Sequence, residues 1–219
     1  MSIPKKARIL LLADEVDRAY YQFWKPERFQ DIDLIISCGD LPARYLEFIA
    51  TLFHGEVLYI PGNHDQNYLH HPPEGCINID DRIYEWHGLR ILGLGGSMRY
   101  KPGPFQYTQQ EMDRRLSKLR YKLYFSSGID ILVTHAPAFE QHDGKDLCHI
   151  GFQAFNTIIE RYHPRYFFHG HVHLSYGSYP RKYFIEETEC INAFSSFVVE
   201  IPLPEENHSK FPKRWFSKR

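Results

Sequence analysis

Short apolar runs that stop abruptly at a polar side chain recur along this sequence, and they constrain its fold more than any other feature. Runs of about four to seven apolar residues are typical of strands that are buried on both faces of a sheet. The five clearest runs cover residues 7–13, 33–37, 57–60, 129–134 and 166–168. Each is followed by residue types that bind metals, which in chain order are Asp14, Asp40, Asn63 with His64, His135, and His171 with His173.

The segments between the first runs predict crossover helices. Residues 20–29, interrupted by Pro26, lie between the first two runs, and residues 43–53 lie between the second and the third. Strands and helices that alternate in this way form a parallel α/β sheet with right-handed crossovers. Because such sheets carry their chemistry beyond the carboxyl ends of the strands, we expect the polar residues there to gather at one edge.

The rest of the chain mixes short antiparallel strands with two helices. A helix over 109–125 begins with the capping-box pattern Thr108-Gln109-Gln110-Glu111, and a second helix over 152–162 ends before Pro164. A tight turn at His87-Gly88 joins two of the strands. The strands are predicted over 77–81, 82–86, 89–94, 183–185 and 194–201. The basic side chains expected on the exposed side of the first helix are Arg114, Arg115, Lys118, Arg120 and Lys122.

The composition fits one folded α/β domain with no large electrostatic field. Hydrophobic residues make up 43% of the 219 residues and charged residues 24%, which excludes a disordered chain. The formal charge of −1 gives no bulk attraction to nucleic acid. We find no internal repeat and no linker, so the sequence predicts one domain over 1–219. Its core covers about 7–201, and a basic tail covers 202–219.

The sequence also predicts a cytoplasmic protein without membrane contact. No apolar stretch approaches the ~18 residues that span a bilayer, and the run over 9–13 ends too early for a signal peptide. The cysteines are widely separated and form no Cys-x-x-Cys pair. We therefore expect reduced packing residues, rather than disulfides or zinc ligands, at Cys38, Cys76, Cys148 and Cys190.

The polar residues after the strands form a set of metal ligands without sulfur. Carboxylate, amide oxygen and imidazole together suit Mn²⁺, Fe or Zn²⁺. The set is too large for one ion and fits a pair about 3.5–4 Å apart, with Asp40 as the natural bridge. His171 and His173 project to the same side of an extended chain, about 6–7 Å apart, which lets them serve two neighbouring ions. Taken singly, Asp14 and Asp40 would also suit helix N-caps.

At this point the motifs resemble a known family, the calcineurin-like metallophosphoesterases. The blocks that carry the resemblance are Gly39-Asp40, Gly62-Asn63-His64-Asp65, Thr134-His135 and Gly170-His171-Val172-His173. The resemblance implies a four-layer α/β/β/α sandwich of mixed sheets with a two-metal site. One metal would take Asp14, Asp40 and His173, and the other would take Asp40, Asn63, His135 and His171. His64 matches the proton-donating histidine of the family.

One position departs from the family pattern. The family shows Asp-x-His after its first strand, whereas this chain has Asp14-Glu15-Val16, and valine binds no metal. We expect the first metal to bind weakly, or only one site to be filled. Glu15 and Asp17 are the candidate substitutes, although neither is in phase with Asp14 along an extended strand.

The resemblance predicts a metal-dependent phosphoesterase that hydrolyses a small phosphomonoester or phosphodiester. A metal-activated hydroxide would attack phosphorus, His64 would protonate the leaving group and Asp65 would orient His64. Candidate substrate-binding residues are Asn63, His64, Arg99 and His149. For Arg99 a surface position at a turn, and for His149 a solvated loop, are equally good interpretations.

Two alternative functions remain from the sequence. A non-catalytic metal-binding scaffold or regulator would explain Val16 in place of the usual histidine. A nuclease is also compatible with the family, but the near-neutral charge does not favour it, since a nuclease needs a basic channel. The sequence leaves the oligomeric state open.

Overall fold

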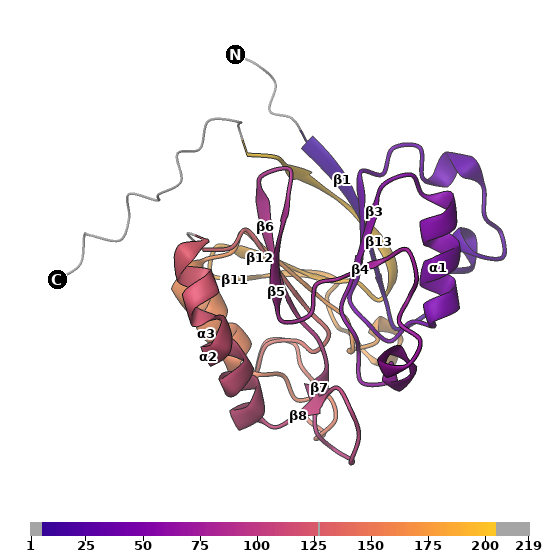
Figure 1. The fold of residues 1–219 in the computed structure, drawn as a ribbon. Coiled ribbons are helices and arrows are strands. Elements are labelled where there is room, and N and C mark those ends of the chain that lie inside the picture. Colours follow the sequence, from indigo (N-terminus) through magenta and orange to yellow (C-terminus); the bar gives the residue numbers. More distant parts are fainter. Residues whose placement is uncertain (1–5, 127, 205–219) are drawn as a thin grey trace.

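The computed structural model describes residues 6–126 and 128–204, and it confirms the four-layer α/β/β/α sandwich. Figure 1 shows two sheets packed against each other. Helix α1 (Ala43–Leu52) lies outside one sheet, and α2 (Gln109–Phe125) and α3 (Gln153–Tyr162) lie outside the other. The tail predicted over 202–219 lies outside the described residues from 205 onward. None of the helices in the described part is long and apolar enough to cross a membrane.

The first sheet is parallel except at one edge. Its order is β13-β1-β2-β3-β4, and β13 runs antiparallel to β1 while the other neighbours are parallel. The three apolar runs near the N-terminus form its centre, as predicted. The strands are β1 (Lys6–Ala13), β2 (Leu34–Ser37), β3 (Glu56–Tyr59), β4 (Ile77–Asn78) and β13 (Ser195–Pro202).

The second sheet has a parallel centre and two antiparallel edges, in the order β11-β12-β10-β9-β6-β5. Strand β12 was not predicted from the sequence. The strands are β5 (Arg82–Trp86), β6 (Leu89–Leu94), β9 (Ile131–Thr134), β10 (Tyr166–His169), β11 (Lys182–Ile185) and β12 (Thr188–Asn192). A small separate pair consists of β7 (Ser97–Met98) and β8 (Gln106–Tyr107).

Three hydrophobic clusters fill the three spaces between the four layers. Along β1, Ile9 and Leu11 belong to the cluster between the sheets, while Leu10 and Leu12 belong to the cluster beneath α1. All four side chains are fully buried. This explains why β1 is a continuous apolar run, because both faces of the strand are covered. A third cluster lies between the second sheet and the helices α2 and α3.

The crossover helix predicted over 20–29 is wrong. The segment contains two short 3₁₀ turns, at Arg18–Tyr20 and Pro26–Arg28. Pro26 forces the residue before it out of the helical region, and Lys25 is extended, with φ −141° and ψ 139°. The aromatic side chains Tyr21 and Trp24 pack against the cluster beneath α1 instead.

The antiparallel strand predicted over 77–81 is also wrong. Strand β4 covers only Ile77–Asn78 and pairs parallel with β3 in the first sheet. The chain then crosses to the second sheet, where β5 and β6 form the predicted hairpin. His87 and Gly88 have φ values of 46° and 79°, as a type I′ turn requires at both central positions.

The cysteines are free, as predicted, but they do not all serve as packing residues. Cys38 and Cys190 are buried within the hydrophobic clusters. Cys76 is half-buried and packs against the cluster beneath α1. Cys148 differs, because its thiol lies among polar groups, 2.6 Å from Asp146 Oδ2.

Helix α2 begins at the predicted capping box, but one of its basic residues is not on the exposed side. Thr108 and Glu111 exchange the expected side-chain to backbone hydrogen bonds. Arg115 is buried: its guanidinium pairs with Asp80 at 2.6 Å and with Asp81 at 3.0 Å, and it lies over the Tyr107 ring. Arg115 was predicted to be exposed because the helix sequence does not show its acidic partners, Asp80 and Asp81, which lie in the segment that crosses from β4 to β5.

Replacing Arg115 with leucine is expected to lower the free energy of unfolding by about 3–5 kcal/mol, because Asp80 would keep a largely buried charge without its partner. Urea unfolding of the purified protein measures the loss. Arg114→Leu, on the exposed side of the same helix, serves as the control and should change stability by less than about 0.5 kcal/mol. Equal effects of the two variants would contradict the structural role of Arg115.

Candidate metal centre

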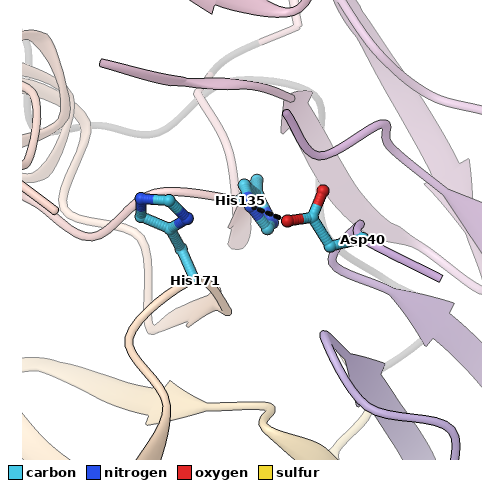
Figure 2. Close-up of side chains that lie close together, drawn as sticks. All are labelled: Asp40, His135 and His171. Atoms are coloured by element: carbon cyan, nitrogen blue, oxygen red, sulfur yellow. Dashed lines mark ion pairs between the residues drawn. The ribbon is translucent and has the colours of Figure 1, made fainter. Parts of the chain in front are cut away.

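The predicted ligands meet where the carboxyl ends of four parallel strands come together. Asp14 and Asp40 follow β1 and β2 of the first sheet, and His135 and His171 follow β9 and β10 of the second. Figure 2 shows the Asp40 carboxylate facing the His135 ring, with the His171 ring beside it. Neither aspartate is a helix N-cap, because Pro42 occupies that position in α1 and Asp17 caps the first 3₁₀ turn.

Three of these residues have a backbone conformation that is unfavourable for their type. Asp14, Asp40 and His171 have φ values of 65°, 58° and 68°, in the left-handed region. This conformation costs a residue other than glycine about 1–2 kcal/mol. Such strain persists only where the surrounding structure imposes it, and it is concentrated at functional sites.

His135 is fully buried and presents one defined nitrogen to two oxygens. Its Nδ1 donates to the Cys38 carbonyl at 2.8 Å, so Nε2 is the nitrogen that would bind a cation, in exchange for its proton. Nε2 lies 3.2 Å from Asp40 Oδ2 and 3.1 Å from Asn63 Oδ1. Two atoms that bind one cation at ~2.1 Å and at right angles are ~3.0 Å apart. The spacing of these three atoms therefore fits a shared divalent cation.

His171 lies next to this group. Its Nε2 donates to the Cys148 carbonyl at 2.6 Å, so Nδ1 is the nitrogen left for a ligand. The rings of His171 and His135 are 4.8 Å apart. One potential ligand atom each from Asp40, His135 and His171 lie within 4.8 Å of one another.

Asp14 and His173 form a looser pair next to His171. The Asp14 carboxylate is almost fully buried, and both of its oxygens lie 3.0 Å from the His171 amide nitrogen. His173 Nε2 is 3.9 Å from Asp14 Oδ1, and the His173 ring packs against Phe194. Gly170 is required here, since a Cβ atom on it would lie 2.8 Å from Asp14 Oδ2.

The residues at and beside position 16 differ in whether their side chains are available to bind a cation. Val16 packs against the hydrophobic cluster beneath α1. The Asp17 carboxylate accepts hydrogen bonds from the Ala19 amide and the Ser196 hydroxyl, one on each oxygen. Glu15 is exposed, and its charge acts on the His173 imidazole. Of the two candidate substitutes, only Glu15 keeps a carboxylate available near His173.

The loop after β3 is fixed by carboxylates that accept main-chain hydrogen bonds. Asp65 Oδ2 accepts from the amides of Asp40 and Gly62, both at 2.7 Å. Asp40 Oδ1 accepts from the His64 amide at 2.7 Å. A Cβ atom on Gly62 would lie 2.1 Å from Asp40 Oδ1, so only glycine fits. Asp65 thus holds the two loops together, and the His64 side chain is exposed beside them.

Burial and neighbouring charges shift the pKa values of the whole group. Burial, with a contribution from Asp40, raises the pKa of Asp14 to about 7 and that of Asp65 to about 7. Burial opposes the charged form of His135, but the Asp40 carboxylate outweighs it and raises the pKa of His135 to about 9. Burial and His135 lower the pKa of His171 to about 3. Closely spaced carboxylates and a neutral imidazole are an environment that favours a cation.

The two other predicted substrate-binding residues, His149 and Arg99, lie outside the group of candidate ligands. The His149 ring is 5.1 Å from the His171 ring, so the loop that carries it reaches the site. Arg99 pairs with Glu111 at 2.8 Å and donates to the Gln106 carbonyl, which ties it to the start of α2. The structure thus brings His149 to the candidate ligands and commits Arg99 to a contact elsewhere.

Sequence reasoning missed two residues that contact the site. Asn192 at the end of β12 donates to the Val172 carbonyl at 2.7 Å and holds the loop with His171 and His173. The Tyr100 hydroxyl lies 3.5 Å from Asn63 Nδ2. Asn192 follows a strand at the same sheet edge, but the apolar run before it was too short to be recognised. We find no sequence signal for Tyr100.

The comparisons with known proteins agree with this fold and these motifs. The family model described as calcineurin-like phosphoesterase matches residues 8–175. The chain therefore belongs to the calcineurin-like phosphoesterase family, which supports a metal-dependent phosphoesterase in general terms.

Individual relatives add the fold but no established activity. The chain is 26% identical to a UPF0046 protein of Caenorhabditis elegans, covering 77% of this chain and 70% of the relative. It is 25% identical to an uncharacterized protein of Haemophilus influenzae, covering 80% and 87%. The crystal structure of TT1561 of Thermus thermophilus matches with a TM-score of 0.62 and 16% identity, over 91% of this chain and 100% of that chain.

The buried pair of His135 and Asp40 should make the stability of the metal-free protein depend on pH. The pKa of His135 is raised from 6.5 to about 9, so its stabilising contribution is complete below pH 6.5 and is lost as the pH rises through 9. Above pH 8 His171 is neutral in the folded and unfolded states alike, and Asp14 and Asp65 are largely ionised.

With a chelator present, the free energy of unfolding should fall by about 1 kcal/mol between pH 8 and 9. Denaturant unfolding at several pH values measures the slope. His135→Asn should flatten it, whereas His70→Gln, at an exposed histidine, should leave it unchanged. A wild-type profile as flat as that of His135→Asn would be the contrary result.

Proposed function

We propose that this chain hydrolyses small phosphate esters, mono- or diesters, at a site that holds two divalent cations. Asp40, Asn63, His135 and His171 would hold one cation. The observation that carries the proposal is the position of Asp40 Oδ2 and Asn63 Oδ1, 3.2 Å and 3.1 Å from Nε2 of buried His135. Asp14, Asp40 and His173 would hold the other cation, with Glu15 as a further carboxylate.

The donor chemistry favours Mn²⁺, with Fe and Zn²⁺ as alternatives, since the ligands are oxygen and imidazole nitrogen without sulfur. When bound, the cations would supply Lewis acidity and lower the pKa of a coordinated water. The cation held by Asp14, Asp40 and His173 would bind more weakly than the other, because Val16 packs against apolar side chains where the family has an imidazole.

The protein itself would supply the proton and the orientation. The hydrogen bond from the His64 amide to Asp40 Oδ1 anchors His64 next to the candidate ligands, and its exposed side chain faces incoming substrate. We assign His64 the transfer of a proton to the departing ester oxygen, a step typically worth about 10²–10⁴ in rate. Asp65 acts through the main chain, because its hydrogen bonds fix the Asp40 and Gly62 amides.

A basic wall next to Asn63 suits the rest of an anionic substrate. Tyr100, which approaches Asn63, and Lys101 line an open cavity of about 560 Å³ together with Arg99, Pro102 and Gly103. Lys101 Nζ lies 5.2 Å from the centre of the Tyr100 ring. An open, partly basic cavity of this kind accommodates a phosphate ester that carries an aromatic or second anionic group.

His64→Ala is expected to lower kcat for an aryl phosphodiester by about 10²–10⁴ with Mn²⁺ added, because the leaving group loses its proton donor. Release of the aryl alcohol measures the rate. Asp40→Asn should lose both activity and bound Mn²⁺, whereas His70→Ala, at an exposed histidine outside the candidate ligands, should retain full activity.

The alternative function is a non-catalytic metal-binding scaffold, which the apolar environment of Val16 favours. In that case the wild type, His64→Ala and Asp40→Asn would all be equally inert with Mn²⁺, Fe²⁺, Zn²⁺ and Co²⁺. This outcome would refute the proposed hydrolysis. It would not refute the proposed metal binding, which the activity assay does not measure.

Val16→His is expected to tighten the weaker cation by about 10–100-fold, since it restores the imidazole of the family's Asp-x-His pattern two residues after Asp14. Calorimetric titration of chelator-treated protein with Mn²⁺ gives the affinity and the stoichiometry. Val16→Ala removes the same apolar contact without adding a ligand, so it controls for repacking. Two equally tight cations in the wild type would contradict the assignment of a weakened first site.

A further inference from the structure

A second group of metal-ligating atoms lies in a turn outside the candidate metal centre. Asp146, Cys148 and His149 each contribute one atom, and these atoms lie within 4.8 Å of one another. Asp146 Oδ2 is 2.6 Å from Cys148 Sγ and 2.7 Å from His149 Nδ1, and Sγ is 3.3 Å from the same nitrogen. Carboxylate oxygen, thiol sulfur and imidazole nitrogen therefore converge on one point.

This arrangement differs from that of a nucleophilic cysteine with a histidine and an aspartate. In such a relay the histidine uses one nitrogen for the nucleophile and the other for the acid that orients it. Here both Cys148 Sγ and Asp146 Oδ2 contact Nδ1 of His149. Each of the three ligand atoms contacts the other two, which suits a shared cation. A relay for proton transfer would instead connect the three side chains in series.

The turn holds the three side chains together through its main chain. The amides of His149 and Ile150 donate to the Asp146 carbonyl at 3.0 Å and 3.2 Å, and the Gly144 amide donates to the His149 carbonyl at 2.9 Å. Cys148 and His149 are half-buried and Asp146 is exposed, so the group is open to ions from solvent. To bind a tetrahedral cation, the three atoms would have to spread from hydrogen-bond distances to about 3.3–3.6 Å, which side-chain rotations within the turn can supply.

We propose that Asp146, Cys148 and His149 form a separate binding site for a thiophilic divalent cation, above all Zn²⁺. Zinc binds cysteine, histidine and carboxylate side chains, and three protein ligands leave one position for water or another ligand. The candidate metal centre, in contrast, contains no sulfur, so the two sites select cations of different softness. The sequence-based view of Cys148 as a packing residue is replaced by a ligand role.

The turn site is also connected to the candidate metal centre. The Cys148 carbonyl accepts the hydrogen bond from His171 Nε2, and the rings of His149 and His171 are 5.1 Å apart. A cation that fixes the Cys148 side chain therefore also fixes the group that orients His171. The proposed turn site stands on its own contacts and does not depend on the proposed hydrolysis.

Titration with Cd²⁺ tests the proposal, because a cadmium–thiolate bond gives an ultraviolet charge-transfer band that oxygen and nitrogen ligands do not give. Chelator-treated full-length protein should develop this band with an amplitude of one cadmium–thiolate bond per chain, after allowance for Cd²⁺ that the candidate metal centre binds without a band. Cys148→Ser should abolish it. Cys76→Ser, at the other half-buried cysteine, is the matched control and should leave it unchanged.

Asp146→Asn and His149→Gln should weaken Cd²⁺ binding at the turn by at least about tenfold, as followed by the same band. Far-ultraviolet circular dichroism verifies that each variant is folded. A band that persists in Cys148→Ser, or no band in the wild type after enough Cd²⁺ to fill the candidate metal centre as well, would overturn the proposal. The candidate metal centre contains no sulfur, so a missing band would refute the turn site without refuting the proposed hydrolysis. Conversely, a protein without phosphoesterase activity could still show the band.

Discussion

The position of His135 between the two sheets is the interaction on which the rest of the site depends. His135 follows β9 of the second sheet, yet both of its nitrogens contact groups that follow strands of the first, the Cys38 carbonyl and the side chains of Asp40 and Asn63. A fully buried imidazole without such partners would cost several kcal/mol. These contacts therefore fix how the carboxyl ends of the two sheets meet, and with them the distances among the candidate ligands.

The site is built at the expense of local backbone stability. Asp14, Asp40 and His171 each occupy the left-handed region, and Gly62 and Gly170 each leave no room for a side chain next to a carboxylate. Burial raises the pKa of Asp14 to about 7, although the charge of His135 opposes the shift. A structure that strains its backbone to gather buried carboxylates and imidazoles is organised for a cation, because packing alone would favour apolar residues here.

The sequence allowed the central strands and the candidate ligands to be predicted because both depend on a local pattern, an apolar run followed by a polar residue. Parallel strands then bring these residues together without further information. The predictions that were wrong concern residues whose role depends on contacts with distant residues, or on a helix-breaking proline, and the local pattern shows neither. Arg115 is buried because Asp80 and Asp81 reach it from the crossover between the sheets. The segment over 20–29 carries enough aromatic residues to pack, but Pro26 prevents the helix. Cys148 has its role only through the turn that places Asp146 and His149 around it.

X-ray diffraction from crystals soaked in Mn²⁺, with anomalous data collected at the manganese absorption edge, tests the central claim most directly. We expect a strong anomalous peak bounded by Asp40, Asn63, His135 and His171, and a weaker peak next to Asp14 and His173. A density map without a peak between His135 and Asp40, although manganese is bound elsewhere on the protein, would contradict the account.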